Sequence, residues 1–449
     1  MAIGGVIGAG FFLGSGLAIS KAGPALLIAY VLAGTVVFLM MRALGELSLA
    51  YPSAGSFSTY ATQFIGPITG FVTGWSFWLT ALIVGVAEST GIGLLWHQWH
   101  PGTPQWIPAL FAVLLLYGIN MRTVESFGEV EFWLSLIKVF TIVGVLIYGT
   151  AILLFKIGDL GRHAAVSNLW TYGGLLPKGI SGLVASLPAV MFAFGGIEVL
   201  GLAAAETENP QKTLPRAING VFYRILFFYI GSLALMMVLF PWNGIDPQQS
   251  PFVLILINAG LPAAANVVTF VAITALFSSC NNALYGTSRM ASALAASGQA
   301  PLRLQKLNKR NIPAFSVTLS ASILMIGVLL NYLIPDRIFF YALTAIAWLM
   351  LGYWAVIALC HLNYVRGKSR EKLVRGAFQL PGSPYANWFI LVMISLVAVS
   401  FAINSTTRHV LYIFVVWIGL LVAGYYGLVR EEQFARNFVK WLGLLFFLD

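Results

Sequence analysis

Three ionisable side chains lie within stretches of this chain that are otherwise apolar. They are Glu88 in GVAESTG, Lys138 in EFWLSLIKVFTIVG and Glu198 in FAFGGIEVLGLAAAE. An ionised group at the centre of a bilayer costs at least about 2.5 kcal/mol, so such a residue usually faces a cavity or a charged partner. A buried carboxylate or ammonium can exchange a proton or bind a group of opposite charge. These residues are therefore the first candidates for function.

Glycines interrupt two of the apolar stretches, AIGGVIGAG (2–10) and FAFGGIEVLG (192–201). Each glycine in a helix interior costs about 1 kcal/mol relative to alanine, so both stretches favour a broken helix. A helix broken within a membrane leaves N–H groups at one end and C=O groups at the other without partners. A zwitterion satisfies both, through its carboxylate and its ammonium. The alternative is that the glycines only permit close helix packing. Two matched segments favour the broken-helix site.

The composition defines the class of protein that must position these residues. Hydrophobic residues make up 59% of the chain and charged residues 9%, with a mean hydropathy of +0.87. An average soluble protein has about a quarter charged residues. The chain is therefore predicted to be an all-α polytopic membrane protein, and its formal net charge of +10 does not indicate nucleic-acid binding. The two cysteines have no metal-like spacing.

Apolar runs long enough to cross about 30 Å of hydrocarbon recur along the whole chain. The matched glycine segments lie five spans apart, which is typical of an inverted repeat. We expect a first repeat at 1–155, a second at 180–363, two further spans within 386–429 and an amphipathic cytoplasmic tail at 430–449. About twelve spans are expected, at residues 1–20, 24–49, 67–97, 104–121, 130–155, 180–206, 217–240, 262–293, 314–334, 338–363, 386–404 and 409–429.

The basic residues predict the orientation of these spans. If the N-terminus is cytoplasmic, 18 of the 25 lysine and arginine residues fall in the inner loops and the tail. Two of the inner connectors, 297–314 and 366–376, are especially basic. The excess of positive charge on one side places both termini in the cytoplasm.

Several motifs, in order along the chain, resemble those of one family. They are GGVIGAGFFLGSG (4–16), RALGEL (42–47), GEVEFWLSLIK (128–138), FAFGGIEVLGLAAAETENPQKTLPRAIN (192–219), SPFV (250–253) and SRM (288–290). In these motifs the chain resembles the amino acid permeases of the amino acid, polyamine and organocation superfamily, specifically those of the bacterial amino acid transporter branch. The resemblance covers nearly the whole chain. It implies a LeuT-type five-plus-five inverted repeat with two additional C-terminal helices.

The resemblance also implies a substrate site at the two glycine segments. Backbone N–H groups would receive the substrate carboxylate at Gly8, Ala9 and Gly10. Carbonyl groups would receive its ammonium at Phe192, Ala193 and Gly195. Glu198 would orient the broken backbone, and two aromatic side chains would shape or close the pocket, Phe192 and Phe194.

Lys138 matches a lysine that, in related transporters, takes the place of a structural sodium ion between spans 1 and 8. Its ammonium, held at low dielectric, can lose and regain a proton. This favours proton coupling over sodium coupling, and the alternative is a permanently charged lysine that only braces carbonyls. Ser278 and Ser279 are its expected partners on the eighth span. Glu88 is a second candidate for proton coupling.

These features predict uptake of an amino acid across the bacterial cytoplasmic membrane by proton symport with alternating access. An amino acid exchanger of the same fold is the alternative. An intramembrane enzyme would need a nucleophile with its base, or a ligand cluster, at bilayer depth, and the sequence offers neither. A passive channel would show a continuous polar lining instead of matched broken helices. The absence of a clear acidic cluster in spans 3, 8 and 10 favours a neutral substrate, and we expect no metal or cofactor.

The start of the chain departs from the family pattern. Family members usually have a basic cytoplasmic tail and additional helix before the segment that begins here at Ala2. The inner half of the first span, which contributes to the cytoplasmic gate, is therefore expected to be short. A late start, a fragment or a leaky or inactive transporter would each give this pattern.

Overall fold

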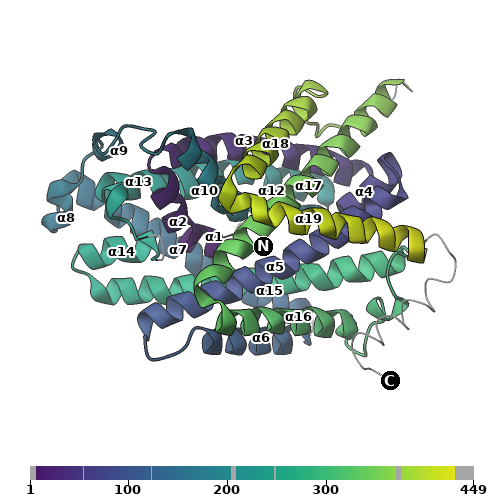
Figure 1. Ribbon diagram of the computed structural model, residues 1–449, viewed down its shortest axis with the longest axis horizontal. Coiled ribbons are helices and arrows are strands. Elements are labelled where there is room, and N and C mark those ends of the chain that lie inside the picture. The colour runs from purple at the N-terminus through teal and green to yellow at the C-terminus, as the bar shows by residue number, and fades with distance from the viewer. Residues whose placement is uncertain are drawn as a thin grey trace.

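The computed structural model describes residues 7–53, 55–122, 124–203, 209–246, 249–370 and 376–429. Nearly all of these residues lie in helices, and no strand occurs among them (Figure 1). In hydrocarbon a backbone must satisfy its hydrogen bonds within its own segment, which explains why the apolar runs form helices. Proline occupies the first turn of α5, α14 and α15, where no intrahelical N–H bond is lost.

The described part of the predicted first repeat contains α1 to α7. Their bounds are α1 (Ala9–Phe12), α2 (Gly14–Ala22), α3 (Ala25–Ala50), α4 (Ser56–Phe64), α5 (Pro67–Trp99), α6 (Trp106–Asn120) and α7 (Val124–Phe155). The sequence predicted no helix between residues 49 and 67, where α4 lies, because this helix is too short and too polar to stand out as a span.

The connector between the two predicted repeats contains the short helices α8 (Gly158–His163) and α9 (Asn168–Thr171). The second repeat then runs through α10 (Gly179–Phe194), α11 (Val199–Ala203), α12 (Pro210–Arg224), the π-helix η2 (Ile225–Gly231), α13 (Ser232–Leu239), η3 (Trp242–Gly244), α14 (Pro251–Asn258), α15 (Pro262–Ala296), η4 (Leu302–Leu304), α16 (Ala314–Leu333) and α17 (Pro335–Arg370). The chain continues through α18 (Tyr385–Ile403), α19 (Ser405–Gly424) and η5 (Tyr425–Val429).

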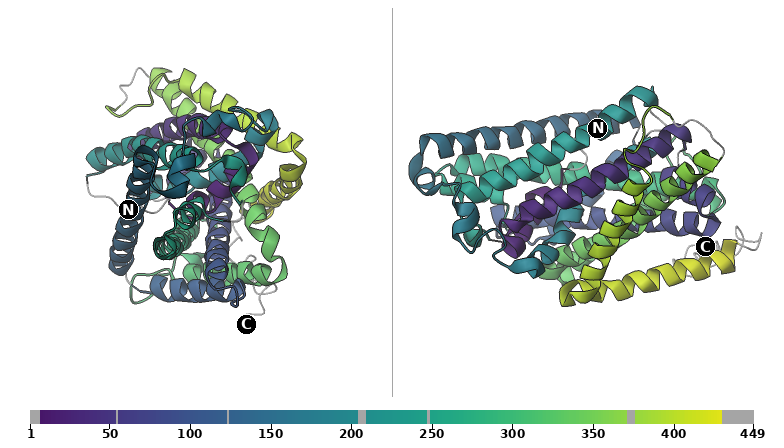
Figure 2. Two further views of the ribbon diagram at one scale, coloured as in Figure 1. Left: turned by 90° about the vertical axis from the view of Figure 1, so that its left-hand side faces the viewer. Right: turned by 90° about the horizontal axis from the view of Figure 1, so that it is seen from above.

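Burial separates central from peripheral helices. The most apolar window of α5 is 67% buried, and α5 packs extensively on α15. The corresponding windows are 22% buried in α7 and α18 and 11% buried in the segment Thr407–Gly427. Figure 2 shows α18 and α19 on the outside of the bundle. The site residues on α5, α10 and α15 are therefore held by the most enclosed part of the protein.

Nine helices in the described residues are long and apolar enough to cross a membrane. Two shorter apolar helices, Trp106–Asn120 and Phe227–Leu239, come in addition. The chain is thus an all-α polytopic membrane protein, as predicted. The count of twelve spans and the repeat boundaries remain predictions, and the predicted tail at 430–449 lies outside the described residues.

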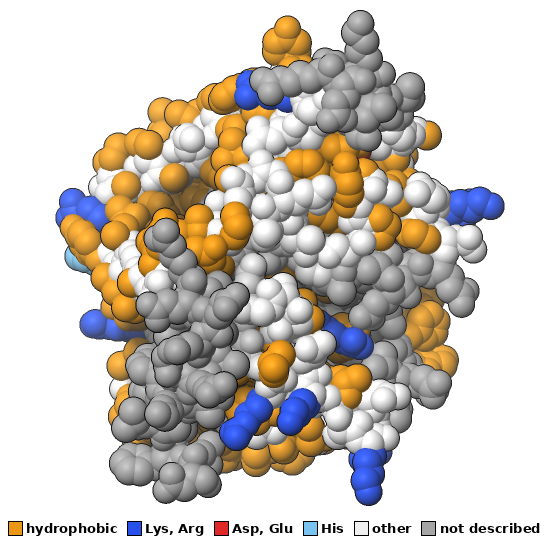
Figure 3. All heavy atoms as spheres, turned by 90° about the vertical axis from the view of Figure 1, so that its right-hand side faces the viewer, with side chains coloured by type: hydrophobic (Ala, Val, Ile, Leu, Met, Phe, Trp, Pro, Cys, Tyr) orange, Lys and Arg blue, Asp and Glu red, His pale blue; other side chains and the backbone are white. Residues whose placement is uncertain are grey.

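Basic side chains gather at one end of the bundle, as Figure 3 shows for the face at the right of Figure 1. The connector between α15 and α16 alone carries Arg303, Lys306, Lys309 and Arg310. The sequence predicts that this connector is cytoplasmic, so the basic end of the bundle is the predicted inner end.

Candidate functional site

The first glycine segment leads into a helix that begins inside the protein. Ile7 is fully buried, and Gly8 has φ −136° and ψ −148° immediately before α1. A helix start leaves its first N–H groups without intrahelical partners. A helix therefore starts inside the protein directly after Gly8, as a break at this segment requires, whereas residues 1–6, with Gly4 and Gly5, lie outside the described residues.

The second glycine segment separates α10 from α11. The helix ends at Phe194, Gly195 is extended with φ −61° and ψ 146°, and Gly196 has φ +87°. A positive φ of this size is strained for residues other than glycine. Residues 195–198 form turns before α11 begins. The expected helix break is thus present here as well.

The two breaks lie against each other. A Cβ atom added to Gly10 would lie 2.8 Å from Cα and 2.9 Å from the backbone nitrogen of Ala193. Real side chains do not tolerate such distances, so only glycine permits this approach of α1 to α10. The chain thereby brings together the two segments that the resemblance assigns to the two ends of a zwitterion.

Glu88 reaches the first break from α5. The side chain is 2% exposed, and its Oε2 accepts a hydrogen bond of 2.9 Å from the N–H of Ala9. Its Oε1 accepts a hydrogen bond of 2.9 Å from Ser279 Oγ on α15. Ala9 N–H is one of the groups predicted to receive the substrate carboxylate, and in this structure a carboxylate of the chain itself occupies it.

Lys138 approaches the same break from α7. Its side chain is fully buried, and Nζ donates to Ser278 Oγ at 2.9 Å and, over a longer distance of 3.5 Å, to the carbonyl of Ile7. Ser278 is therefore the partner predicted for Lys138. Ser279 was predicted to contact the same lysine, but its hydroxyl donates to Glu88 instead. Neighbouring serines on α15 thus hold an ammonium and a carboxylate beside the first break.

The carbonyls of the second break already accept hydrogen bonds within the protein. Phe192 O accepts the N–H of Gly195 at 2.9 Å, and Ala193 O accepts the hydroxyl of Tyr229 at 2.6 Å. A carbonyl oxygen has two lone pairs, so each can accept one more donor. The sequence did not indicate Tyr229, because aromatic residues are common in membrane helices.

Aromatic rings enclose this carbonyl. Tyr229 lies edge-on to Phe11 at 5.2 Å and tilted against Phe194 at 5.4 Å between ring centroids. Tyr30 of α3 contacts Phe194 and Tyr229. Phe194 is fully buried in this cluster, whereas Phe192 lies beside Gly10. Of the two phenylalanines predicted to shape the pocket, Phe192 is thus the one at the contact of the breaks.

Glu198 lies in the turn that separates α10 from α11 and is 2% exposed. Its Oε1 accepts a hydrogen bond from the hydroxyl of Tyr353 on α17. The Tyr353 ring in turn stacks on Phe57 with 5.9 Å between centroids. This contact ties the broken segment to α17, which agrees with an orienting role for Glu198. No motif in the sequence pointed to Tyr353.

Among the described residues, no group of three or more His, Cys, Asp or Glu side chains is arranged to hold a metal ion. The two described cysteines, Cys280 and Cys360, are free and buried.

Gly10→Ala is expected to reduce transport strongly, because the new methyl group forces α1 and α10 apart. Overpacking of this kind costs about 1–3 kcal/mol, which corresponds to a loss of transport rate of roughly 5- to 150-fold. Gly14→Ala is the matched control, because its Cβ would meet its nearest atoms at 3.6 and 3.8 Å, which is ordinary contact. Initial uptake rates of the two variants in proteoliposomes test this. Equal rates would contradict the close contact of the breaks.

The fold and the site together describe a polytopic helical membrane protein whose buried polar groups converge on two helix breaks. The family model described as amino acid permease matches residues 1–441. The amino acid permease YtnA of Bacillus subtilis is 40% identical over 427 residues, which cover 95% of this chain and 92% of YtnA. The aromatic amino acid transport protein AroP of Escherichia coli K12 is 40% identical over 425 residues, with 95% and 92% coverage. The probable threonine/serine transporter YbxG of B. subtilis is 37% identical over 440 residues, with 98% and 95% coverage.

The chain therefore belongs to the amino acid permease family. It is a multi-pass membrane transporter of amino acids and not an enzyme.

Proposed function

We propose that this protein takes up a neutral amino acid by proton symport, with the zwitterion bound between the two helix breaks. The observation that carries the proposal is the hydrogen bond from Ala9 N–H to Glu88. The substrate carboxylate needs a backbone donor at this break, and Glu88 accepts the hydrogen bond of that donor. Substrate and Glu88 therefore compete for it.

Charge balance makes protonation of Glu88 the natural way to resolve this competition. The first break holds one buried ammonium, on Lys138, and one buried carboxylate, on Glu88. A substrate carboxylate would bring a second negative charge into a region from which water is excluded, and such an uncompensated charge is costly. If Glu88 takes up a proton, the charge near Lys138 stays the same while the substrate carboxylate replaces that of Glu88.

The substrate ammonium would then meet the carbonyls at the end of α10. The second lone pair of Ala193 O remains for it beside the hydroxyl of Tyr229. Phe192 and Gly195 would contribute the neighbouring carbonyls, and Glu198 would hold the turn through Tyr353. Alternating access would follow if α1 and α10 separate and close around the bound zwitterion.

A neutral substrate fits the charges of the site, because Lys138 and Glu88 already balance each other near the first break. Two similar proteins carry names that refer to neutral amino acids, AroP for aromatic amino acids and YbxG for threonine and serine. The basic end of the bundle would face the cytoplasm of a bacterial cell, as the excess of positive charge indicates (Figure 3).

An exchanger of the same fold is the second candidate, since the breaks would bind a zwitterion in the same way. Unlike a symporter, an exchanger needs no proton, because it always replaces one bound zwitterion by another. The carboxylate of Glu88 on Ala9 N–H favours symport, because protonation of Glu88 would release this donor to the substrate carboxylate.

A competition experiment tests the substrate class. Uptake of labelled phenylalanine and of labelled serine into proteoliposomes is measured against each of the twenty amino acids, with and without an imposed pH gradient. We expect neutral amino acids to compete and an acidic exterior to increase uptake. Competition by lysine or arginine alone would contradict the neutral substrate, and uptake that ignores the gradient would contradict symport.

A further inference from the structure

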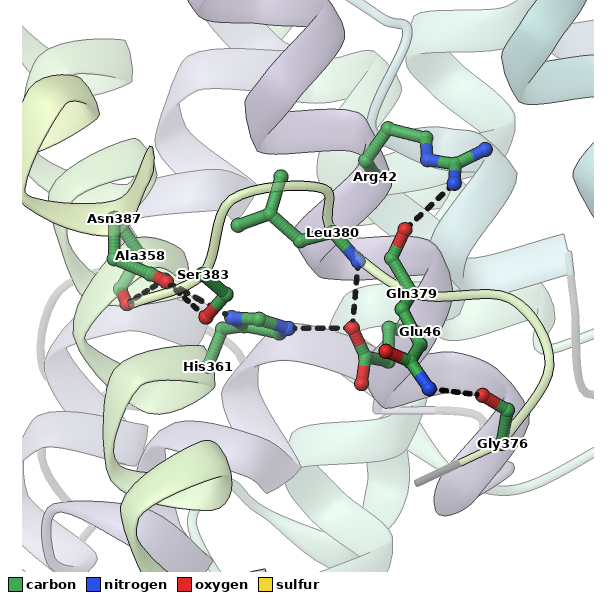
Figure 4. A network of polar contacts seen from close by, with 9 residues as sticks. All are labelled: Arg42, Glu46, Ala358, His361, Gly376, Gln379, Leu380, Ser383 and Asn387. Atoms are coloured by element: carbon green, nitrogen blue, oxygen red, sulfur yellow. Dashed lines mark hydrogen bonds and ion pairs between the residues drawn. The ribbon is translucent and has the colours of Figure 1, made fainter. Parts of the chain in front are cut away.

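A second buried polar cluster lies away from the helix breaks and joins α3, α17 and α18 (Figure 4). Its central residues are Glu46 of α3, His361 of α17 and Asn387 of α18, which are 2%, 0% and 0% exposed. Burying charged and polar groups in a protein is costly unless they are paired. The contacts that the sequence predicted for transport do not use them. We refer to Glu46, His361 and Asn387 as the clasp.

Glu46 uses one oxygen to hold two parts of the chain. Its Oε2 is 2.9 Å from His361 Nε2 and accepts the N–H of Leu380 at 2.7 Å. Leu380 belongs to the connector between α17 and α18. One turn earlier on α3, Arg42 donates to the carbonyl of Gln379 at 2.6 Å and lies over the ring of Phe378 at 4.0 Å. The end of α3 is therefore hydrogen-bonded both to α17 and to the connector that follows it.

The hydrogen bonds of Asn387 identify the form of His361. Asn387 Nδ2 donates to the carbonyl of Ala358 at 3.0 Å and lies 2.9 Å from His361 Nδ1. The amide oxygen accepts the Ser383 hydroxyl at 2.8 Å and is farther from His361 Nδ1, at 3.3 Å. An amide nitrogen can only donate, so Nδ1 must accept. The proton of a neutral imidazole is then on Nε2, and His361 donates it to Glu46.

This chain of bonds fixes the position of α17 along and around its axis. Apolar side chains in a membrane pack without strong direction, whereas a hydrogen bond between helices accepts one register only. His361 is eight residues beyond Tyr353 on the same helix, which corresponds to about 12 Å of rise. Tyr353 holds Glu198 at the second helix break. A shift of α17 would therefore displace the hydroxyl that supports this break.

We propose that the clasp is a positioning device for transport: Glu46 and Asn387 hold His361 so that α17 presents Tyr353 to Glu198. His361 acts through Tyr353 and touches no substrate. The clasp thus supports the second helix break from the end of α3. The transport readout of this proposal rests on the proposed function, whereas its stability readout does not.

A matched pair of substitutions at His361 tests whether the hydrogen bond to Glu46 is required, or only a polar side chain at this position. In His361→Gln the side-chain amide reaches the place of Nε2 and can still donate to Glu46. In His361→Asn the amide reaches only the place of Nδ1, so the bond to Glu46 is lost. We expect His361→Asn to raise the KM for labelled phenylalanine or serine about tenfold, as for a loss of about 1.4 kcal/mol. His361→Gln is expected to stay close to the wild type.

A double-mutant cycle measured by thermal unfolding of the purified protein tests the link to Tyr353. Residues that share no contact normally give additive effects. We expect His361→Asn and Tyr353→Phe together to lower the melting temperature by less than the sum of their separate shifts. Glu46→Gln replaces His361→Asn in the same cycle if the latter does not fold, because its neutral amide oxygen weakens the hydrogen bond from His361 without removing it.

Asn331→Leu is the control for the cycle. Asn331 lies on α16, is 1% exposed and donates to Thr90 Oγ1 of α5 at 2.8 Å, so it is equally buried but not part of the clasp. Its effect should add to that of Tyr353→Phe. The proposal is overturned if the clasp variants are also additive with Tyr353→Phe, or if His361→Gln damages the protein as much as His361→Asn. If the wild type transports neither probe, the proposed function fails and the unfolding cycle alone decides on the clasp.

Discussion

Glu88→Gln is expected to abolish accumulation driven by a pH gradient and to leave exchange of internal for external amino acid measurable. The glutamine oxygen can still accept the N–H of Ala9, but the amide cannot carry a proton. With the membrane potential clamped at zero, a gradient of about one pH unit supports at most roughly tenfold accumulation if one proton accompanies each substrate. The wild type should approach this ratio, whereas the variant should only equalise the concentrations.

Glu198→Gln is the matched control, because it makes the same chemical change in another buried glutamate. Its carboxamide oxygen can still accept the hydroxyl of Tyr353, so uptake should keep its dependence on the gradient even if its KM changes. Accumulation by Glu88→Gln that equals that of the wild type would remove Glu88 from the coupling step.

Lys138→Ala is expected to abolish uptake driven by a pH gradient and to destabilise the protein. The substitution removes the ammonium from Ser278 and from the carbonyl of Ile7. It also removes the positive charge that acts on the buried carboxylate of Glu88, and an uncompensated buried charge is costly. Uptake in proteoliposomes and thermal unfolding of the purified protein measure the two effects.

The double variant Lys138→Ala, Glu88→Gln separates the effect of the uncompensated Glu88 charge on stability from the loss of proton-coupled accumulation. Removal of the uncompensated carboxylate should restore much of the lost stability, but accumulation should stay absent. Lys156→Ala is the control, because Lys156 follows the end of α7 and is exposed. Unchanged accumulation in Lys138→Ala would exclude this lysine from the mechanism.

Much of the fold could be predicted from the sequence, because a long apolar run in a membrane must satisfy its backbone hydrogen bonds internally and therefore forms a helix. The predicted span at 314–334 is α16 within one residue, and that at 386–404 is α18 within one residue. The break at 192–201 could be predicted since Gly195 and Gly196 stand beside an ionisable residue. The short helix α4 could not, because its nine residues resemble a polar connector.

The site was only partly predictable, because hydrogen bonds between distant helices leave no local pattern. Lys138 and Ser278 are 140 residues apart, and their pairing was expected only from the resemblance to the family. Tyr229 and Tyr353 were missed because an aromatic residue in a membrane helix is usually packing. Glu46 and His361 are 315 residues apart, and neither carries a spacing that relates it to the other.

The central claim is that a proton enters with each amino acid because Glu88 must be neutralised when the substrate carboxylate binds. The most direct test places a pH-sensitive dye inside proteoliposomes that hold no amino acid, with equal pH on both sides and the membrane potential clamped at zero. We predict that external phenylalanine or serine acidifies the lumen in proportion to its uptake in the wild type and not in Glu88→Gln. Uptake that occurs only against internal amino acid, with no change in lumen pH, would contradict the account.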